Sequence, residues 1–320
     1  MITSAKIYLT ECTDPHKNLA MEEALLRSLP EGQAVMFLWQ NRHTVVIGSG
    51  QNAWRECNTA LLEAEGGTLA RRSSGGGAVY HDLGNLNFSF VMPRADYDVD
   101  RQLTVVMNAV RTLGLNAEKT GRNDLTIGGR KFSGNAFRLL KETALHHGTL
   151  LISSDREMVG RYLTPDKDKL KAKGVKSVAS RVVTLESLGD VTVESMCGAM
   201  MEAFRAEYGA AQAGVLCAEA LPGYRELLER NRSWEWNYGF SPEGMIELSR
   251  RFAWGGVQLA AEVVGGRAKC VRVYTDSMDE TLAGRLAEAL TGCAWRGEEL
   301  AEKALSAGEE DVAGWLRETV

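Results

Sequence analysis

The sequence predicts a protein of mixed α and β structure that is divided into two domains. Short runs of β-branched and aromatic residues, typical of strands, are interspersed with stretches in which apolar residues recur at helical spacing. The length of 320 residues exceeds that of one ordinary domain. With 44% hydrophobic residues the chain can bury a substantial core, so we expect an ordinary globular protein.

The N-terminal part is expected to begin with a strand over Lys6–Thr10, followed by a helix that ends near Leu29. Asp14 suits the N-cap of this helix, and Pro15 suits its first turn, where a missing N–H costs nothing. Further strands are predicted near Ala34–Trp39, Thr44–Gly48, Leu86–Met92 and 146–152, and further helices around Arg55–Ala64, Arg101–Leu113 and Val193–Tyr208.

The pattern changes after residue 239, which marks the expected start of a second domain. A short helix over Pro242–Arg251 is predicted to lead into a hairpin with strands Val257–Val264 and Lys269–Tyr274. Residues 277–280 then read as a capping box that opens a helix to about Leu290. The predicted domains are therefore 1–240 and 246–320.

Composition excludes several classes of protein. The net charge of −5 and pI of about 5.7 argue against a nucleic-acid partner. No apolar run approaches the length of a membrane span, and the first residues lack the pattern of a secretory signal. The six cysteines form no CxxC pair and are expected to be reduced thiols. These observations together predict a cytoplasmic protein with no membrane partner.

Two cations and two hydroxyls lead directly into three glycines at residues 71–77. Glycine backbone can approach a ligand closely, because no Cβ holds the ligand away and unusual φ values cost little. The arginines and serines supply charge and donors suited to a phosphate or a carboxylate. This segment predicts an anion-binding loop, and a plain glycine-rich turn with solvated arginines is the alternative.

A hairpin is predicted over residues 121–138, with its turn at Gly128-Gly129. Alternate strand residues share a face, so Lys131, Ser133 and Asn135 are expected to point the same way. By the same rule the adjacent histidines 146 and 147 should face opposite sides of their strand. At least one of these two is expected to be a packing or hydrogen-bonding residue and not a metal ligand.

Together these segments resemble the lipoate–protein ligase A family, in its bacterial form with a C-terminal accessory domain. The resemblance rests on several ordered motifs and covers nearly the whole chain: residues 44–58, 71–90, 121–138, 146–153, 169–182, 233–239 and 251–259. It implies a mixed-sheet α+β catalytic domain like that of biotin ligases and class II aminoacyl-tRNA synthetases, followed by a small α+β domain.

The resemblance also implies the reaction. Enzymes of this family activate lipoate with ATP to form lipoyl-AMP and pyrophosphate. They then transfer the lipoyl group to one lysine of an acceptor domain. ATP is thus an expected substrate, with Mg²⁺ as its cofactor. The expected acceptors are apo lipoyl domains of 2-oxoacid dehydrogenase complexes and the glycine-cleavage H protein.

Site residues are assigned by the same resemblance. Lys131 matches the lysine that contacts both ATP and lipoate, and it is the expected catalytic residue. The other matched positions are Arg72, Gly77, Ala78, Val79 and Tyr80 for ATP, and Ser74, His81 and Arg138 for lipoate.

Two further segments are expected to serve the reaction. Asn123 and Asp124 look like contacts for the nucleotide or for Mg²⁺, since a carboxylate suits a hard cation. Residues 161–181 hold seven cations and two acids. The resemblance makes this segment a loop that closes over the adenylate and excludes water; a solvated basic face is the alternative.

Two other functions remain open from the sequence. One is a transferase of the same fold that works through a cysteine thioester without ATP; no cysteine lies between Cys57 and Cys197, but Cys12 or Cys57 could approach the site in space. The other is a non-catalytic protein that binds an acyl-adenylate. The presence of Lys131 favours chemistry over binding alone.

Overall fold

The computed structural model describes residues 1–120, 124–163, 182–241, 244–279 and 281–320. Two compact units make up these residues. Unit 1 comprises Met1–Ser49 and Ala70–Arg232, and unit 2 comprises Gly50–Leu69 and Ser233–Val320. Residues 50–69 thus lie in the same compact unit as the C-terminal part of the chain.

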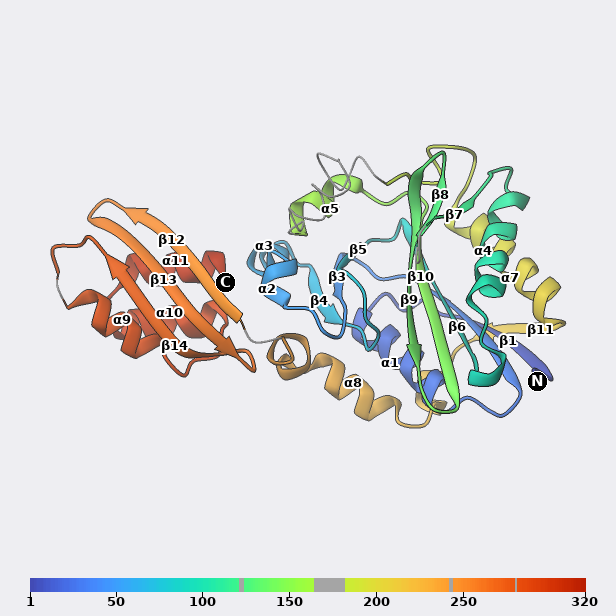
Figure 1. The fold of residues 1–320 in the computed structure, drawn as a ribbon, viewed down its shortest axis with the longest axis horizontal. Coiled ribbons are helices and arrows are strands. Elements are labelled where there is room, and N and C mark those ends of the chain that lie inside the picture. Colours follow the sequence, from blue (N-terminus) through green and yellow to red (C-terminus); the bar gives the residue numbers. More distant parts are fainter. Residues whose placement is uncertain (121–123, 164–181, 242–243, 280) are drawn as a thin grey trace. The chain divides into compact units, whose positions relative to one another are not determined.

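Unit 1 is built on a mixed sheet of eight strands in the order β11-β1-β2-β6-β10-β9-β8-β7 (Figure 1). These strands are β1 (Ser4–Leu9), β2 (Gln33–Trp39), β6 (Asn85–Pro93), β7 (Glu118–Thr120), β8 (Asp124–Ile127), β9 (Arg130–Leu139), β10 (Thr143–Leu151) and β11 (Ala211–Val215). β1 runs parallel to both β2 and β11, whereas the pairs from β2 to β7 are antiparallel. A smaller sheet has the order β4-β3-β5, with β3 (Thr44–Ile47), β4 (Thr68–Arg71) and β5 (Val79–His81).

The helices of unit 1 are α1 (Pro15–Arg27), α4 (Val99–Thr112), α5 (Arg156–Tyr162), α7 (Val193–Tyr208) and α8 (Tyr224–Arg232), with short 3₁₀ turns η1 (Arg94–Asp96) and η3 (Ala218–Ala220). α1 begins at Pro15 because Asp14 accepts hydrogen bonds from the N–H groups of His16 and Lys17. The predictions of α1, α4 and α7 are confirmed, as are those of the strands β1, β2, β3, β6 and β10.

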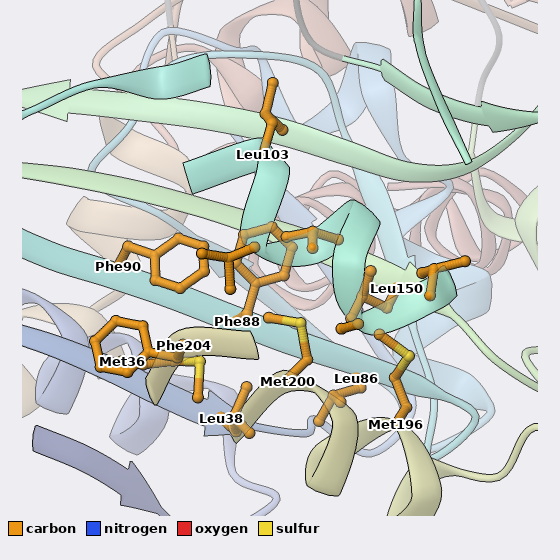
Figure 2. Packing of buried hydrophobic residues seen from close by; sticks show 14 of the residues in the cluster. Met36, Leu38, Leu86, Phe88, Phe90, Leu103, Leu150, Met196, Met200 and Phe204 are labelled. Carbon is orange, nitrogen blue, oxygen red and sulfur yellow. The ribbon is translucent and has the colours of Figure 1, made fainter. Parts of the chain in front are cut away.

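One face of the large sheet carries the main hydrophobic core. The side chains of Phe88 and Phe90 on β6 are fully buried beneath α4 and α7, and Phe204 of α7 stacks on Phe90 with 5.9 Å between ring centroids (Figure 2). Met36 on β2 and Met200 on α7 complete this layer. Helices α4 and α7 thus cover the apolar side chains of this face, and the opposite face of the sheet is left to form a site.

The opposite face is covered partly by α1, which packs against α8. Glu23 of α1 is buried and lies 2.5 Å from Arg27, 3.0 Å from Arg138 of β9 and 2.7 Å from Arg230 of α8. Burial alone would raise the pKa of Glu23, but the hydrogen bonds and positive charges of these arginines outweigh burial and lower it to about 2. The carboxylate of Glu23 therefore links α1 to strand β9 and to helix α8 through ion pairs.

Unit 2 contains a second core. Its elements are α2 (Ala53–Glu56), α3 (Thr59–Ala64), the π-helical turn η4 (Glu235–Gly239), β12 (Gly244–Phe252), β13 (Gly255–Val264), β14 (Arg267–Thr275), α9 (Leu282–Leu290), α10 (Gly297–Ser306) and α11 (Glu310–Thr319). The three strands form an antiparallel sheet, and alternate residues of β13 such as Val257 and Leu259 pack against the helices. The predicted hairpin of β13 and β14 is confirmed.

Three predictions in unit 2 are wrong. Residues 244–252 form strand β12 and not a helix, because nine residues of this segment pair with β13. The single helix expected over Arg55–Ala64 is two short helices, each with its own asparagine N-cap. The helix expected to end near Leu290 is confirmed as α9, but its predicted start is wrong, because α9 begins at Leu282 after the N-cap Thr281 and not at a capping box that starts at Ser277.

No helix among the described residues is both long and apolar enough to cross a bilayer.

Candidate functional site

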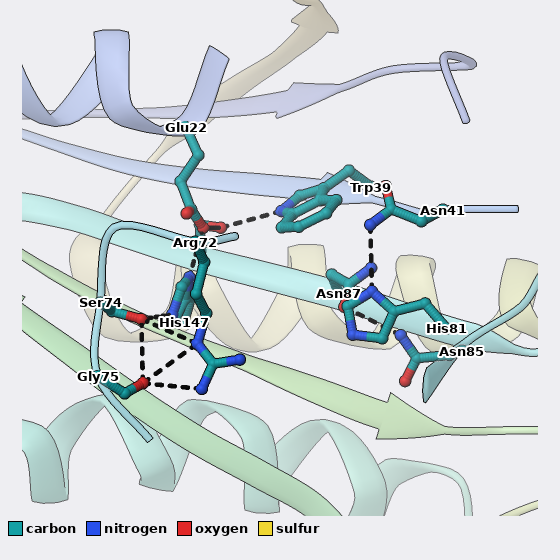
Figure 3. A network of polar contacts seen from close by, with 11 residues as sticks. Glu22, Trp39, Asn41, Arg72, Ser74, Gly75, His81, Asn85, Asn87 and His147 are labelled. Atoms are coloured by element: carbon teal, nitrogen blue, oxygen red, sulfur yellow. Dashed lines mark hydrogen bonds and ion pairs between the residues drawn. The ribbon is translucent and has the colours of Figure 1, made fainter. Parts of the chain in front are cut away.

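The glycine-rich loop folds around the side chain of Arg72. All three nitrogens of the buried guanidinium donate hydrogen bonds. Nε donates to Ser74 Oγ and to the carbonyl of Gly75, which also accepts from Nη2 at 2.8 Å (Figure 3). Nη2 donates in addition to the carbonyl of Gly77 at 2.8 Å, and Nη1 donates to the carbonyl of Val46. Burial lowers the pKa of Arg72 to about 10, while the charge of Glu22 acts in the other direction. Arg72 thus remains a cation that organises the loop.

Only one of the three glycines in this loop requires glycine for its own conformation. Gly76 has φ of +98°, and a Cβ there would lie 2.8 Å from Arg72 Nη2. At Gly75 and Gly77, by contrast, a Cβ would meet nothing within 4 Å. The backbone of Gly77 is therefore uncovered on the side where a side chain would project, and this residue lines the cavity described below.

The loop faces a surface formed by successive strands of the large sheet. Trp39 of β2, Asn87 of β6 and Thr149 of β10 are paired across neighbouring strands and form one row on this face. A second row contains Ser89 and His147. Because strand residues alternate between faces, these side chains point away from the main core.

A cavity of about 460 Å³ lies between the loop and this sheet face. Its lining residues are Leu19, Trp39, Val46, Arg72, Gly76, Gly77, Ala78, Val79, His81, Asn87, Asp124, Lys131, Gly134, Asn135, Ala136, His147, Gly148 and Thr149. This volume falls within the range of small-molecule sites. Leu19, Trp39 and Val46 give the part near β2 and β3 an apolar wall, next to the buried guanidinium of Arg72. Asp124 and Lys131 line the part near β8 and β9.

Lys131 reaches the cavity because β9 contains a bulge. The register between β8 and β9 shifts between Leu125 and Thr126. Lys131 Nζ passes over Gly134, where it lies 2.9 Å from the point that a Cβ would occupy if this residue had a side chain. The same Nζ lies 2.7 Å from Asp124 Oδ1. The prediction that Lys131 shares a face with Ser133 and Asn135 is wrong, because the bulge interrupts the alternation.

Ser133 and Asn135 lie on the opposite side of β9 from Lys131. Asn135 Nδ2 lies 3.4 Å from Ser133 Oγ, and Asn135 Oδ1 lies 2.9 Å from His146 Nε2 on the core side. His146 is fully buried against the rings of Phe88 and Phe137, and burial lowers its pKa to about 3. His146 and His147 face opposite ways, which confirms that prediction.

His147 links the loop to helix α1 through a buried hydrogen-bond network (Figure 3). Its Nδ1 lies 2.8 Å from Glu22 Oε1, and its Nε2 lies 2.6 Å from Ser74 Oγ. Because the carboxylate only accepts, the network assigns the proton to Nδ1 and leaves Nε2 to accept from the Ser74 hydroxyl. Ser89 Oγ also donates to Glu22 at 2.5 Å, and Trp39 Nε1 donates to Ser89 at 3.0 Å.

Six of the nine residues assigned to the site from the sequence line the cavity: Arg72, Gly77, Ala78, Val79, His81 and Lys131. Ser74, Tyr80 and Arg138 are not among the described lining residues. Ser74 is buried under the loop, Tyr80 packs against Tyr162 at 5.5 Å between ring centroids, and Arg138 points to Glu23. Asn123 and most of the 161–181 segment lie outside the described residues.

Sequence reasoning missed the roles of Glu22, Trp39 and Asn87. Glu22 and Glu23 are adjacent acids within the otherwise apolar stretch 19–26 of α1, which is an unusual place for charge and was a usable signal. Trp39 and Asn87 carry no motif of their own, because their place in the site depends on strand pairing.

Cysteine chemistry finds no support in the described part of the chain. No cysteine is among the cavity-lining residues that the structure describes. Burial and the charge of Glu63 raise the pKa of the Cys57 thiol to about 12, which suppresses its thiolate.

The site therefore combines, in one cavity, a glycine loop, a lysine–aspartate pair and an adjoining apolar region, the arrangement of a small-molecule site. The chain belongs to the family of the lipoyl protein ligase A/B catalytic domain, whose family model matches residues 14–205. A second family model, bacterial lipoate protein ligase C-terminus, matches residues 241–312.

Solved structures of ligases resemble the chain closely. P. falciparum LipL1 in complex with lipoate is 26% identical and covers 98% of this chain and 99% of its own, with a TM-score of 0.67. The bipartite lipoate protein ligase of Thermoplasma acidophilum, described with its E2 lipoyl domain, is 29% identical with a TM-score of 0.68 over 77% of this chain and 100% of its own. A lipoate-protein ligase A bound with ATP is 28% identical, over 75% and 100%, with a TM-score of 0.66.

Proposed function

We propose that this protein is an ATP-dependent lipoate–protein ligase. It activates lipoate to lipoyl-AMP with release of pyrophosphate and then transfers the lipoyl group to a lysine of an acceptor lipoyl domain. The observation that carries the proposal is the cavity itself, which joins a glycine loop and Lys131 to an apolar end at Leu19, Trp39 and Val46. The ATP-bound and lipoate-bound relatives support the same two ligands.

The glycine loop would bind phosphate oxygens through its backbone. The carbonyls of Gly75 and Gly77 point to Arg72. In a trans peptide the N–H lies opposite the carbonyl, so the N–H groups of Gly76 and Ala78 point away from Arg72. Gly76 and Ala78 both line the cavity, and such aligned N–H groups form an anion-binding concavity.

Lys131 would serve both substrates in the first step. A carboxylate oxygen of lipoate attacks the α-phosphorus of ATP, a new P–O bond forms, and pyrophosphate leaves with the electron pair of the broken bond. Negative charge accumulates on the phosphoryl oxygens in the transition state, and a preorganised ammonium stabilises it. The 2.7 Å contact with Asp124 holds the Lys131 ammonium at the cavity.

In the second step the amine of an acceptor lysine attacks the carbonyl carbon of the adenylate. An amide bond forms, AMP leaves, and the amine loses a proton. The same N–H groups and Lys131 stabilise the oxyanion of this addition. We propose lipoyl domains of 2-oxoacid dehydrogenase complexes and the glycine-cleavage H protein as acceptors.

Mg²⁺ fits one residue of the site. Asp124 carries the one carboxylate among the described residues that line the cavity. Mg²⁺ at nucleotide sites is usually bound by one or two carboxylates together with substrate phosphates. Asp124 would hold the ion, and the ion would neutralise phosphate charge.

The remaining assignments follow the same proposal. Tyr80 would contact the nucleotide, and Ser74 and Arg138 would support the lipoate pocket from behind its lining, through His147 and Glu23 respectively. We also propose that residues 1–240 form the catalytic domain, that residues 246–320 form the accessory domain, and that the enzyme works in the cytoplasm.

Replacing Lys131 with Ala tests the proposal. Loss of one preorganised donor costs about 3–4 kcal/mol in a transition state, so adenylation should slow by roughly two to three orders of magnitude. The assay measures pyrophosphate released from lipoate and ATP, followed by the intact mass of an acceptor domain. Lys119→Ala is the matched control, because Lys119 lies on β7 and also pairs with an aspartate, Asp100, outside the cavity. Equal rates for Lys131→Ala and Lys119→Ala would refute the assignment.

A further inference from the structure

Gly134 differs from the other glycines that line the cavity. A Cβ at Gly134 would lie 2.9 Å from Nζ and 3.0 Å from Cε of Lys131, and its next neighbour would be 3.9 Å away. At Gly148, by contrast, a Cβ would meet a buried aromatic ring at 2.6 Å, and at Gly76 the backbone itself has φ of +98°. The close contacts of a side chain at Gly134 would therefore be with the end of a flexible lysine.

The backbone of Gly134 would accept a side chain without strain. Gly134 is not among the described glycines with a positive φ, and it lies within strand β9, where its N–H donates to Thr149 Oγ1 at 3.3 Å. Glycine weakens the interior of a strand, because it loses more conformational entropy on folding and has no side chain to pack. A glycine at such a position usually marks a place that another group approaches closely.

The approaching group is the side chain of Lys131, and the bulge of β9 places it there. The pairing of β8 with β9 passes from Lys131 to Ser133, so Phe132 is the extra residue of the bulge. The ring of Phe132 is fully buried in the main core, and the N–H of Val183 donates to the carbonyl of Lys131 at 2.8 Å. The backbone of Lys131 is thus held on two sides, and its side chain extends over Gly134.

Asp124 lies opposite Gly134 on the neighbouring strand. The two residues are paired in register between β8 and β9, and paired residues of adjacent strands project their side chains to the same face. A side chain at Gly134 would therefore enter the space in which Lys131 Nζ meets Asp124 Oδ1 at 2.7 Å. The bare Cα of Gly134 allows this ion pair to lie against the sheet at the cavity.

We infer that Gly134 is a positioning residue that sets the place of the Lys131 ammonium. This inference rests on the proposed function, in which the ammonium serves both substrates. A Cβ at an ordinary contact distance of roughly 3.5 Å would displace Nζ by at least about 0.6 Å. Reacting groups must be held within about 0.5 Å of their productive geometry, and a misplacement of about 1 Å can slow a reaction roughly a hundredfold. A side chain at Gly134 would thus impair the reaction and leave the fold intact.

Gly134→Ala tests the inference, because it adds one methyl group where the backbone tolerates it. We expect pyrophosphate release from lipoate and ATP to slow roughly 10- to 100-fold. The melting temperature should stay equal or rise by about 1–4 °C, because alanine restricts the unfolded chain more than glycine does. Gly214→Ala is the matched control: Gly214 also lies in a strand, β11, and a Cβ there would meet nothing within 4 Å. This control should keep the wild-type rate.

Two further measurements show whether the effect acts through Lys131. In a Lys131→Ala background, Gly134→Ala should have no additional effect on the rate, because the methyl group has no ammonium to displace. A crystal structure of Gly134→Ala gives a readout that does not depend on catalysis. In it, Lys131 Nζ should have moved by at least about 0.6 Å from its wild-type position beside Asp124.

Four results would overturn the inference: a wild-type rate in Gly134→Ala, a variant that does not fold or melts well below wild type, an equal loss of rate with and without the Lys131 side chain, or an unmoved Nζ. The wild-type protein is measured in the same assay. A wild-type protein that releases no pyrophosphate would contradict the proposed function. Release of pyrophosphate at equal rates by wild type and Gly134→Ala would keep the proposed function and refute this inference alone.

Discussion

Replacing Glu23 with Gln should destabilise unit 1 by an amount that depends on pH. The pKa of Glu23 is lowered from 4.5 to about 2, because the surrounding arginines outweigh burial. At 1.36 kcal/mol per pH unit this lowering corresponds to about 3.4 kcal/mol. A lowered folded-state pKa contributes stability that is complete above pH 4.5 and is lost as the pH falls through 2. The difference between wild type and Glu23→Gln should therefore be about 3 kcal/mol at pH 7 and about 1.5 kcal/mol at pH 3.

The assay is urea unfolding, monitored by hydrogen exchange in peptides from α1. These peptides report on the unfolding of unit 1, which contains Glu23. Glu202→Gln is the control, because Glu202 is 73% exposed and its pair with Arg205 is a surface ion pair worth less than about 1 kcal/mol. A Glu23→Gln difference that stays constant between pH 7 and pH 3 would refute the electrostatic origin and leave packing as the cause.

Two further predictions concern the loop and its support. Gly76→Val should lower both the stability of the protein and its affinity for lipoate, because φ of +98° and the contact with Arg72 exclude a side chain there. Gly77→Val should lower the affinity alone, because a side chain there meets no protein atom within 4 Å. An equal loss of melting temperature in both variants would contradict this difference. Glu22→Leu leaves the His147 Nδ1 proton unpaired and should cost about 1–3 kcal/mol of unfolding free energy and weaken lipoate binding, while Glu22→Gln keeps the accepting oxygen and should remain close to wild type. Identical unfolding curves for the two Glu22 variants would argue against the network.

Local signals were sufficient for most of unit 1. Asp14 and Pro15 predict where α1 begins, and the structure shows Asp14 capping that helix. The Gly128-Gly129 turn predicts the β8–β9 hairpin, and both glycines have positive φ. These features depend on residues close in sequence, so the sequence pattern contains them.

The errors arise where partners distant in sequence decide the outcome. Residues 244–252 contain good helix formers, yet pairing with β13 makes them a strand, since strand preference depends on cross-strand neighbours. The position of Lys131 depends on a bulge, which strict alternation cannot predict. Asn87 enters the site only because β6 lies between β2 and β10.

Arg72 shows why the type of residue in a motif does not by itself reveal its contacts. An arginine beside three glycines suggests a cation that reaches for a phosphate, yet the three nitrogens of Arg72 donate to protein oxygens. A planar guanidinium can bind several carbonyls in fixed directions, which an ammonium group cannot do. By drawing the carbonyls of Gly75 and Gly77 toward itself, Arg72 turns the following N–H groups outward. In the proposed function, the charge of Arg72 would act on a bound phosphate mainly through this oriented backbone, which is already in place without a ligand.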